Sequence, residues 1–255
     1  MVMALLLSVI FNRGVVKQYF PFTAPILLVV ATYILYKTEK KSLKAVGLNL
    51  RPRNISFLLL GLFVGALAFL GARLTRALYV GEFIQISPDF DYNDALIALY
   101  FILPQVATEE LIFRGYLFKK TIEVSNVVIA NVIFSILFTL IHVVDTDILN
   151  NLGMVVMLSV TIPVGHLLFA TGLIKSKTLF FPIGLHLGNN WATRHFISST
   201  KNESVFFIAD SVMFDSWSPF LMMLDLFNGC YVLITFLIWK WDIITRRFRF
   251  KSLFF

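Results

Sequence analysis

Residues 55–72 read ISFLLLGLFVGALAFLGA, a run without one charged side chain. An uninterrupted apolar run of this length is typical of a helix that crosses a bilayer. Six further apolar stretches lie on either side of it, and a chain in lipid must satisfy its backbone groups within helices. We therefore predict an all-α, polytopic transmembrane bundle with a core of antiparallel helices. The predicted spans are 20–36, 55–78, 95–118, 127–143, 152–174, 178–198 and 218–239.

The composition agrees with that prediction. Of the 255 residues, 58% are hydrophobic and 15% are charged, whereas soluble domains have about 45–50% apolar and about 25% charged residues. The polar connections are too short to hold a soluble domain, so residues 1–255 are predicted to form a single integral membrane domain. The net charge of +7 is spread in short runs between apolar segments, which argues against nucleic acid as a partner.

The N-terminal segment leaves the number of spans open. Residues 1–10 are apolar but lack the basic start and small-residue cleavage site of a signal peptide. Ten residues are too few to cross a bilayer, so we expect a short, tilted or interfacial helix. If residues 1–19 form one weakly hydrophobic span, the total rises from seven to eight.

The charges of the connections alternate along the chain. Residues 37–53 carry six Lys or Arg side chains, residues 119–120 and 175–177 add four, and the tail from Lys240 adds five. The other connections are acidic. Since basic connections remain in the cytoplasm, we predict a protein of the cell membrane with a cytoplasmic C-terminus.

Three of the predicted spans carry polar groups at membrane depth. Ionisable side chains are costly there and mark functional sites unless they serve only as structure. We estimate a purely structural network to be the weaker hypothesis, because three separate spans each contribute acid, base or amide groups. These are Glu109, Glu110 and Arg114; then His142; then His186, Asn189 and Asn190. The lone His166 is better interpreted as a helix–helix hydrogen-bonding residue.

Helical periodicity divides the first group. Glu110 and Arg114 are spaced i,i+4 and share a face, which predicts an ion pair. Glu109 is rotated by about 100° from Glu110, so we expect it to face a cavity. The same i,i+4 spacing joins His186 to Asn190.

The fourth span presents a histidine beside an aromatic ring, because Phe138 and His142 also share a helix face. With a turn near residues 125–126, Glu109 and His142 are each about 16 residues away, which predicts that they lie at one depth. A carboxylate and an imidazole that meet there can perform acid–base chemistry on water. The site would then lie about 20–25 Å from the basic turn, beyond the middle of the bilayer.

At these residues the chain resembles the CAAX-protease and bacteriocin-processing family, also called CPBP or Abi. Its three motifs, EExxxR, FxxxH and HxxxN, read here EELIFR at 109–114, FTLIH at 138–142 and HLGNN at 186–190. They occur in the family's order on separate apolar spans. The resemblance covers residues 95–198, which we predict to be the catalytic core.

The resemblance implies an intramembrane endopeptidase. By family analogy, Glu109 activates the attacking water and His142 assists it. His186 and Asn190 would stabilise the oxyanion of the tetrahedral intermediate. Glu110, Arg114 and Phe138 would support the site.

A zinc mechanism is the alternative on chemical grounds. Two histidines and a glutamate are a plausible catalytic set, here Glu109, His142 and His186, and the family is often labelled as metalloproteases. The chain lacks HExxH, and Asn190 suits hydrogen-bond donation better than metal ligation. We therefore favour a glutamate mechanism with no cofactor over a zinc enzyme.

Two other function classes remain open. The first is a protein of the same fold that is not catalytic, either a membrane partner or an immunity or regulatory protein. Such a protein would not need intact motifs, so the three intact motifs count against it. A small transporter also uses buried Glu and His, but we find no repeated halves. For the enzyme, the expected partners are the lipid bilayer and, as substrate, a membrane protein or a lipidated or C-terminal peptide. The sequence does not specify the cleavage motif.

Overall fold

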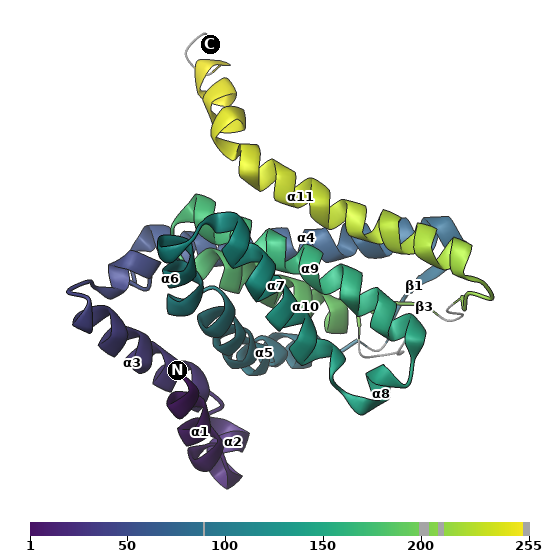
Figure 1. The fold of residues 1–255 in the computed structure, drawn as a ribbon. Helices are drawn as coiled ribbons and strands as arrows, with labels where there is room; N and C mark the ends of the chain where they lie inside the picture. Colours follow the sequence, from purple (N-terminus) through teal and green to yellow (C-terminus); the bar gives the residue numbers. More distant parts are fainter. Residues whose placement is uncertain (89, 199–203, 209–211, 252–255) are drawn as a thin grey trace.

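The structure is a computed structural model that describes residues 1–88, 90–198, 204–208 and 212–251. It is a helical bundle in which α4, α5, α7, α9, α10 and α11 alternate in direction (Figure 1). The elements in chain order are α1 Val2–Phe11, α2 Gly14–Tyr19, α3 Thr23–Thr38, the 3₁₀ helix η1 Leu43–Val46, α4 Pro52–Val80, β1 Ile84–Ile86, α5 Tyr92–Phe113, α6 Tyr116–Val124, α7 Val127–Val143, α8 Thr146–Leu149, α9 Leu152–Ser176, α10 Phe180–His195, β2 Ile197–Ser198, β3 Phe206–Ile208 and α11 Trp217–Lys251.

Helices cover all seven apolar stretches that the sequence marks as spans. Four are long and apolar enough to cross a membrane by length and composition: Pro52–Val80, Tyr92–Val124, Leu152–Ser176 and Trp217–Ile243. Three apolar helices are shorter, namely α1, α3 and α7. The predicted helical membrane architecture is therefore confirmed, whereas the count of seven to eight spans is not.

The N-terminal segment forms two helices. α1 has ten residues and α2 has six, and the chain changes direction between them at residues 12–13. Residues 1–19 are thus not one continuous helix, which removes the basis for an eighth span. The short helix expected for residues 1–10 is present as α1.

The predicted span 95–118 is interrupted. α5 ends at Phe113, Arg114 is its C-terminal cap, and α6 begins at Tyr116. Gly115 makes this break possible, because a Cβ atom there would lie 2.1 Å from the carbonyl oxygen of Leu111. The predicted depth of Glu109 assumed one continuous helix through this point, and that assumption is wrong.

Side-chain caps fix where several helices begin. Asp91 accepts hydrogen bonds from the backbone of Asn93 and Asp94 at the start of α5. Asn126 does the same for α7, which places the turn before it where the sequence predicts it, and Asn151 caps α9. Each cap satisfies backbone amides that a helix start leaves without partners.

The closest helix pair of the bundle is α4 with α10. Gly61 and Gly65 face Gly184 and Gly188, so that each helix presents a GxxxG pair to the other. A Cβ on Gly65 would lie 1.9 Å from the carbonyl oxygen of Leu185. Small residues let two backbones approach in this way, which is how membrane helices pack tightly. The contact holds α10, which carries His186, in the centre of the bundle.

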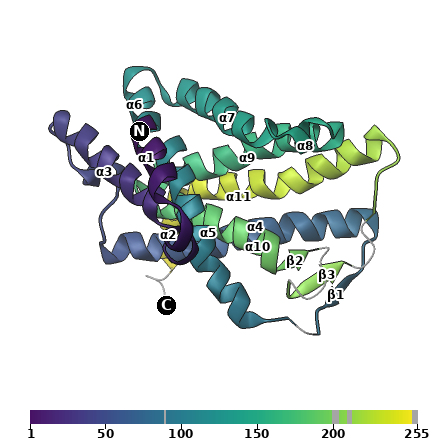
Figure 2. The same cartoon turned by 90° about the horizontal axis from the view of Figure 1, so that it is seen from below.

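A three-stranded sheet ties two connections together at the acidic end of the bundle (Figure 2). β3 pairs antiparallel with β1 and parallel with β2. The prediction of an all-α fold omitted these strands, which have only two or three residues each. Next to them, the buried Glu82 accepts from Arg73 and Arg76, at 2.7 Å in both cases.

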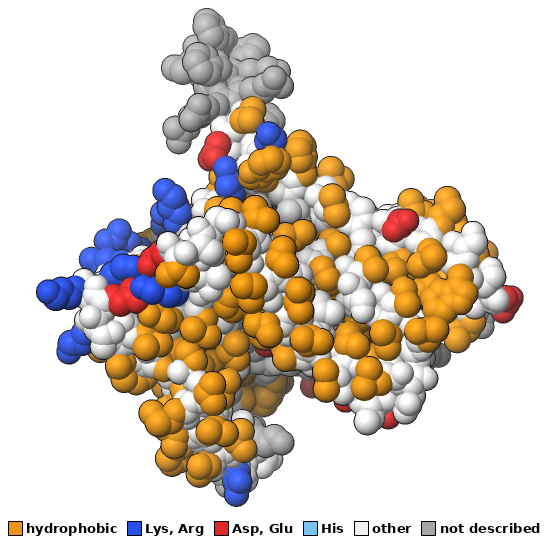
Figure 3. Space-filling view, viewed as in Figure 1, with side chains coloured by type: hydrophobic (Ala, Val, Ile, Leu, Met, Phe, Trp, Pro, Cys, Tyr) orange, Lys and Arg blue, Asp and Glu red, His pale blue; other side chains and the backbone are white. Residues whose placement is uncertain are grey.

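The basic connections gather at the opposite end, seen as the blue group in Figure 3. There Lys41 pairs with Glu123 at 2.8 Å and Lys120 pairs with Glu39 at 2.7 Å. Lys119 also donates to the carbonyl oxygen of Ala45. The predicted segregation of basic and acidic connections is therefore present in the folded chain.

Candidate active site

The centre of the site is a buried ion pair at the end of α5. Arg114 Nη1 donates to Glu110 Oε1 at 3.0 Å, and neither side chain has any exposed surface. This confirms the i,i+4 pair predicted from the sequence. Because such a pair gives up its hydration, it is stable only when further hydrogen bonds satisfy the two groups.

His166, on α9, supplies one of these bonds. Its Nδ1 lies 3.0 Å from Arg114 Nη2, and a guanidinium has only donors. Nδ1 must therefore accept, and the neutral ring carries its proton on Nε2. This nitrogen is buried and has no hydrogen-bond partner among the described residues. The role expected of His166, a hydrogen bond between helices, agrees with this geometry.

His186, on α10, lies between the two glutamates of α5. Its Nδ1 is 2.8 Å from Glu110 Oε1, and its Nε2 is 3.6 Å from Glu109 Oε2. The distance to Glu110 is that of a hydrogen bond, whereas the distance to Glu109 is too long for one. Glu110 thus fixes the ring and turns its other nitrogen toward Glu109.

Glu109 is the less buried of the two carboxylates, with 16% of its side chain exposed. Gln105, one turn earlier on α5, donates to its Oε1 at 3.2 Å. Its Oε2 is buried and has no hydrogen-bond partner within the described parts of the chain. Among those same residues, Glu110 Oε2 is likewise buried without a partner, so the two carboxylates differ in exposure and in their ion pairs rather than in having an unsatisfied oxygen. Glu110 is fully buried and pairs with Arg114, whereas Glu109 is partly exposed.

Two phenylalanines form the walls of the site. The ring of Phe169 stacks on His186 with centroids 4.7 Å apart and planes inclined by 16°. Phe138 meets His186 edge-on at 6.1 Å, and the guanidinium of Arg114 lies 4.2 Å from the centre of the Phe138 ring. These rings keep the charged groups out of contact with lipid and add a cation–π contact to the ion pair.

His142 contacts the site through Phe138. Their rings are 4.7 Å apart, as their shared helix face predicts. His142 Nδ1 donates to the carbonyl oxygen of Phe138 at 2.7 Å, so Nε2 is the ring nitrogen that this bond does not use. Glu109 and His142, both described, form no ion pair within 4 Å, so the structure does not bring these two residues into direct contact.

Asn190 lies one turn beyond His186 on α10. Its Oδ1 accepts from Asn189 Nδ2 at 3.3 Å, and Asn189 in turn accepts from the hydroxyl of Tyr231 at 2.6 Å. Tyr231 lies on α11, so these two hydrogen bonds link α11 to α10. No bond of the Asn190 Nδ2 group is found among the described residues, which leaves an amide donor on the same helix as His186.

The region that carries the three motifs matches a known protein family. The family model described as "Type II CAAX prenyl endopeptidase Rce1-like" matches residues 91–192, which include all three motifs. The resemblance to the CAAX-protease family is confirmed. The match supports an intramembrane peptidase in a lipid bilayer. No match to a curated protein or to a solved structure was found.

The three residues proposed as zinc ligands do not converge in this structure. Among the described residues, no three His, Cys, Asp or Glu side chains converge closely enough to hold a metal ion. His186 alone could ligate through Nε2, since a metal-bound histidine commonly donates its other ring N–H to a carboxylate, as Nδ1 does here to Glu110. His142, however, makes no ion pair with Glu109 in the described part of the chain. The donor set Glu109, His142 and His186 is therefore not arranged as a coordination sphere.

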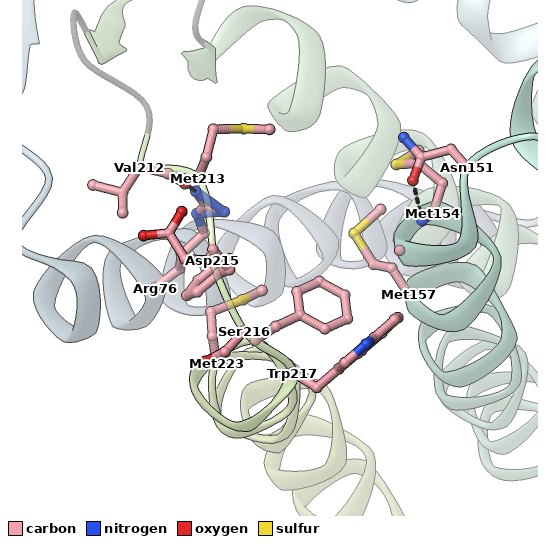
Figure 4. Close-up of a pocket in the computed structure, with 13 residues that line it drawn as sticks. Arg76, Asn151, Met154, Met157, Val212, Met213, Asp215, Ser216, Trp217 and Met223 are labelled. Carbon is pink, nitrogen blue, oxygen red and sulfur yellow. Dashed lines mark hydrogen bonds between the residues drawn. The ribbon is translucent and has the colours of Figure 1, made fainter.

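Two adjoining cavities lie at the acidic end of the bundle. The first, of about 520 Å³, is lined by methionines and aromatic rings, with Arg76 and Asp215 on one wall (Figure 4). The second, of about 290 Å³, shares Arg76, Met157 and Met223 with it and reaches Thr193 on α10. Thr193 is two helical turns, or about 10 Å, from His186. None of the four predicted catalytic residues lines either cavity.

Sequence reasoning missed three contributors to the site. Gln105 is spaced i,i+4 from Glu109, so that helical spacing was a usable signal. Phe169 and the bond from His166 to Arg114 depend on how α9 packs against α5 and α10. No local pattern carries that information.

Proposed function

We propose that this chain is an intramembrane endopeptidase in which Glu109 activates the hydrolytic water. The observation that carries the proposal is the pairing of Glu109 Oε2 with His186 Nε2, which lie 3.6 Å apart. One carries an oxygen without a partner, and the other is held in orientation by Glu110. A carboxylate and an oriented imidazole at one point are what general acid–base catalysis requires.

The reaction is hydrolysis of a peptide bond. Glu109 takes a proton from water while the water oxygen bonds to the carbonyl carbon, and the carbonyl oxygen becomes an oxyanion. Glu109 then returns the proton to the departing amine as the carbon–nitrogen bond breaks. The products are a carboxylic acid and an amine, and no redox partner is needed.

The geometry of His186 supports its role as an oxyanion donor in this proposal. Nδ1 donates to the Glu110 carboxylate, which can only accept, and this bond fixes the ring. The Nε2 end of the ring is thereby turned toward Glu109, 3.6 Å away, where an N–H group can bond the oxyanion.

His142 and Asn190 complete the proposed catalytic set. Asn190 offers its amide from the helix face that carries His186, which suits a second oxyanion donor. His142 is included for its place in the second motif, and its Nε2 is available to orient water. Replacing either with Ala should lower turnover less than replacing Glu109, because neither takes the proton directly.

The substrate in this proposal is a membrane-associated polypeptide. The matching family is described as a prenyl endopeptidase, so a lipidated C-terminal tail is the first candidate. The cavities that extend from Thr193 open at the acidic end, which the distribution of Lys and Arg predicts to lie outside the cytoplasm. Access from that side suits an exported protein without a lipid, which is the second candidate. A glutamate mechanism without metal is favoured because the donor groups do not converge.

The test is cleavage of defined peptides by the purified full chain in lipid nanodiscs. One internally quenched peptide carries a farnesylated C-terminal Cys and three further residues; a second has the same sequence without the lipid. We expect mass spectrometry to show one new C-terminus, and Glu109→Gln to lower turnover by about 10²- to 10⁴-fold. Glu123→Gln, an exposed glutamate at the basic end, is the matched control and should cleave normally.

Three results would count against this proposal in different ways. Unchanged cleavage by Glu109→Gln would remove Glu109 from the chemistry. Failure of the wild-type chain to cut either peptide while still binding them would favour the non-catalytic partner. Stoichiometric zinc with loss of activity on chelation, reversed by zinc, would replace the glutamate mechanism and keep the peptidase.

A further inference from the structure

A groove on the lipid-facing surface lies between α7, α9 and α11. Of these three helices, only α7 carries one of the three motifs. It has a volume of about 430 Å³ and is lined largely by aliphatic and aromatic side chains. In Figure 2 the three helices run side by side, with α9 between the other two. The groove follows α9 from Val164 to Lys175, a rise of about 16 Å. That is about half the thickness of a hydrocarbon core, which is the depth of one leaflet.

One end of this groove is basic. Lys175 lines it directly and is followed by Lys177 in the sequence. On α11, Trp239 lines the same end and Lys240 stacks on its ring at 4.5 Å. Trp beside Lys is typical of the level where hydrocarbon meets lipid headgroups.

A carboxylate already occupies part of this basic end. Lys175 pairs with Asp242 at 2.5 Å, and 60% of the Asp242 side chain is exposed. Arg53 approaches the same end, since it donates to the carbonyl oxygen of Ser176 at 3.2 Å. Counting Arg53, Lys175, Lys177 and Lys240 against Asp242 leaves three positive charges in excess. An anionic group therefore has cations to bind there beyond the existing pair.

The groove wall also offers a buried hydrogen-bond acceptor without a partner in the described part of the chain. Asn131 lines the groove near the start of α7, and its Oδ1 is buried without a donor from the described residues. A headgroup or glycerol hydroxyl can supply that donor. An apolar channel one leaflet deep, a cationic end and an unsatisfied acceptor match the three parts of a phospholipid.

We infer that this groove binds an anionic phospholipid, with one acyl chain along α9 and the phosphate at Lys175. A detergent or zwitterionic lipid fills the apolar part but gains less from the cations. Each Lys near an anionic headgroup contributes enough to change affinity by about fivefold. The inference goes beyond the proposed peptidase activity and does not depend on it.

Lipid retention by the full chain tests this directly. The purified protein is mixed in detergent with equal amounts of dioleoylphosphatidylglycerol and dioleoylphosphatidylcholine, and native mass spectrometry counts the bound lipids. We expect the wild type to retain phosphatidylglycerol preferentially. Lys175→Gln should lower that preference by about fivefold, and Asp242→Asn should raise it, because the competing carboxylate is gone.

Two further variants separate the groove from the general charge of this end. Lys44→Gln removes an exposed cation from the same end outside the groove and should leave the preference unchanged. Thr171→Trp fills the groove and should reduce retention of both lipids. The inference is overturned if the wild type retains the two lipids equally, or if Lys44→Gln acts as strongly as Lys175→Gln. Should Thr171→Trp fail to fold, the opposite signs of Lys175→Gln and Asp242→Asn still decide.

Discussion

Two networks of acids and bases in this protein use similar residues in opposite environments. The buried cluster, formed by Glu109, Glu110, Arg114, His166 and His186, joins α5, α9 and α10 at membrane depth. The basic-end cluster, formed by Glu39, Lys41, Lys120 and Glu123, joins the loop after α3 to α6 in contact with solvent. Each has close pairs of about 3 Å or less, so distance does not distinguish them.

Their surroundings do distinguish them. In the buried cluster Glu110 and Arg114 have no exposed surface, whereas 46% of Glu123 and 37% of Lys41 are exposed. A charge that loses its partner in lipid or protein cannot be solvated by water, but one at the surface can. The two clusters should therefore respond very differently to the removal of one carboxylate.

The largest effect is expected from Glu110→Ala. The change leaves Arg114 buried without its carboxylate, which costs about 3–5 kcal/mol of unfolding free energy. Equilibrium unfolding in mixed micelles measures the loss. The double variant Glu110→Ala/Arg114→Met is the control and should regain most of it, since no unpaired charge remains. A loss in the double variant as large as in the single one would mean that packing around residue 110, rather than the charge, is the cause.

His166→Phe should have the next largest effect on the same cluster. Phe retains the aromatic contacts but removes the acceptor for Arg114 Nη2, which costs about 1–3 kcal/mol. His166→Gln can still accept through its Oε1 and should keep most of the stability. If both variants unfold at the same denaturant concentration as the wild type, the hydrogen bond to Arg114 contributes nothing.

The contrast also explains what the sequence could predict about this site. The pair Glu110–Arg114 and the contact of Phe138 with His142 are local, at i,i+4 on one helix, and both predictions are confirmed. The positions of the apolar stretches follow from composition, and every one is helical. These features depend on short-range periodicity alone.

Features that depend on packing between helices could not be predicted from the short-range periodicity of the sequence. The direct contact of Glu109 with His142 was predicted from equal distances to a turn, but the break at Arg114 and Gly115 interrupts that helix. The structure instead places His186 beside both glutamates. The helix that carries His186 packs against both α5 and α4, where it meets the glycines of α4, and one motif read alone does not reveal this packing.

At the basic end, Glu123→Gln should change stability far less than Glu110→Ala. Lys41 and Lys120 keep Glu39 as a partner and remain hydrated, so the expected loss is below about 0.5 kcal/mol. Repeating the unfolding measurement at about 0.05 M and about 0.5 M salt tests whether the loss comes from exposed ion pairs, because salt screens such pairs. A loss of several kcal/mol that persists in salt would show that this cluster behaves like the buried one.

The smallest effect is expected at Glu39 and should depend on pH. Hydrogen bonds from Lys120 and then Tyr116 lower the pKa of Glu39 from 4.5 to about 2. Because the folded pKa is the lower one, the stabilisation by this carboxylate is complete above pH 4.5 and is lost as the pH falls toward 2. The difference in unfolding midpoint between the wild type and Glu39→Gln should therefore shrink over that window. A difference that stays constant across it would mean that the charge of Glu39 does not contribute, and that its hydrogen bond to Tyr116, at 2.6 Å, is what the variant disturbs.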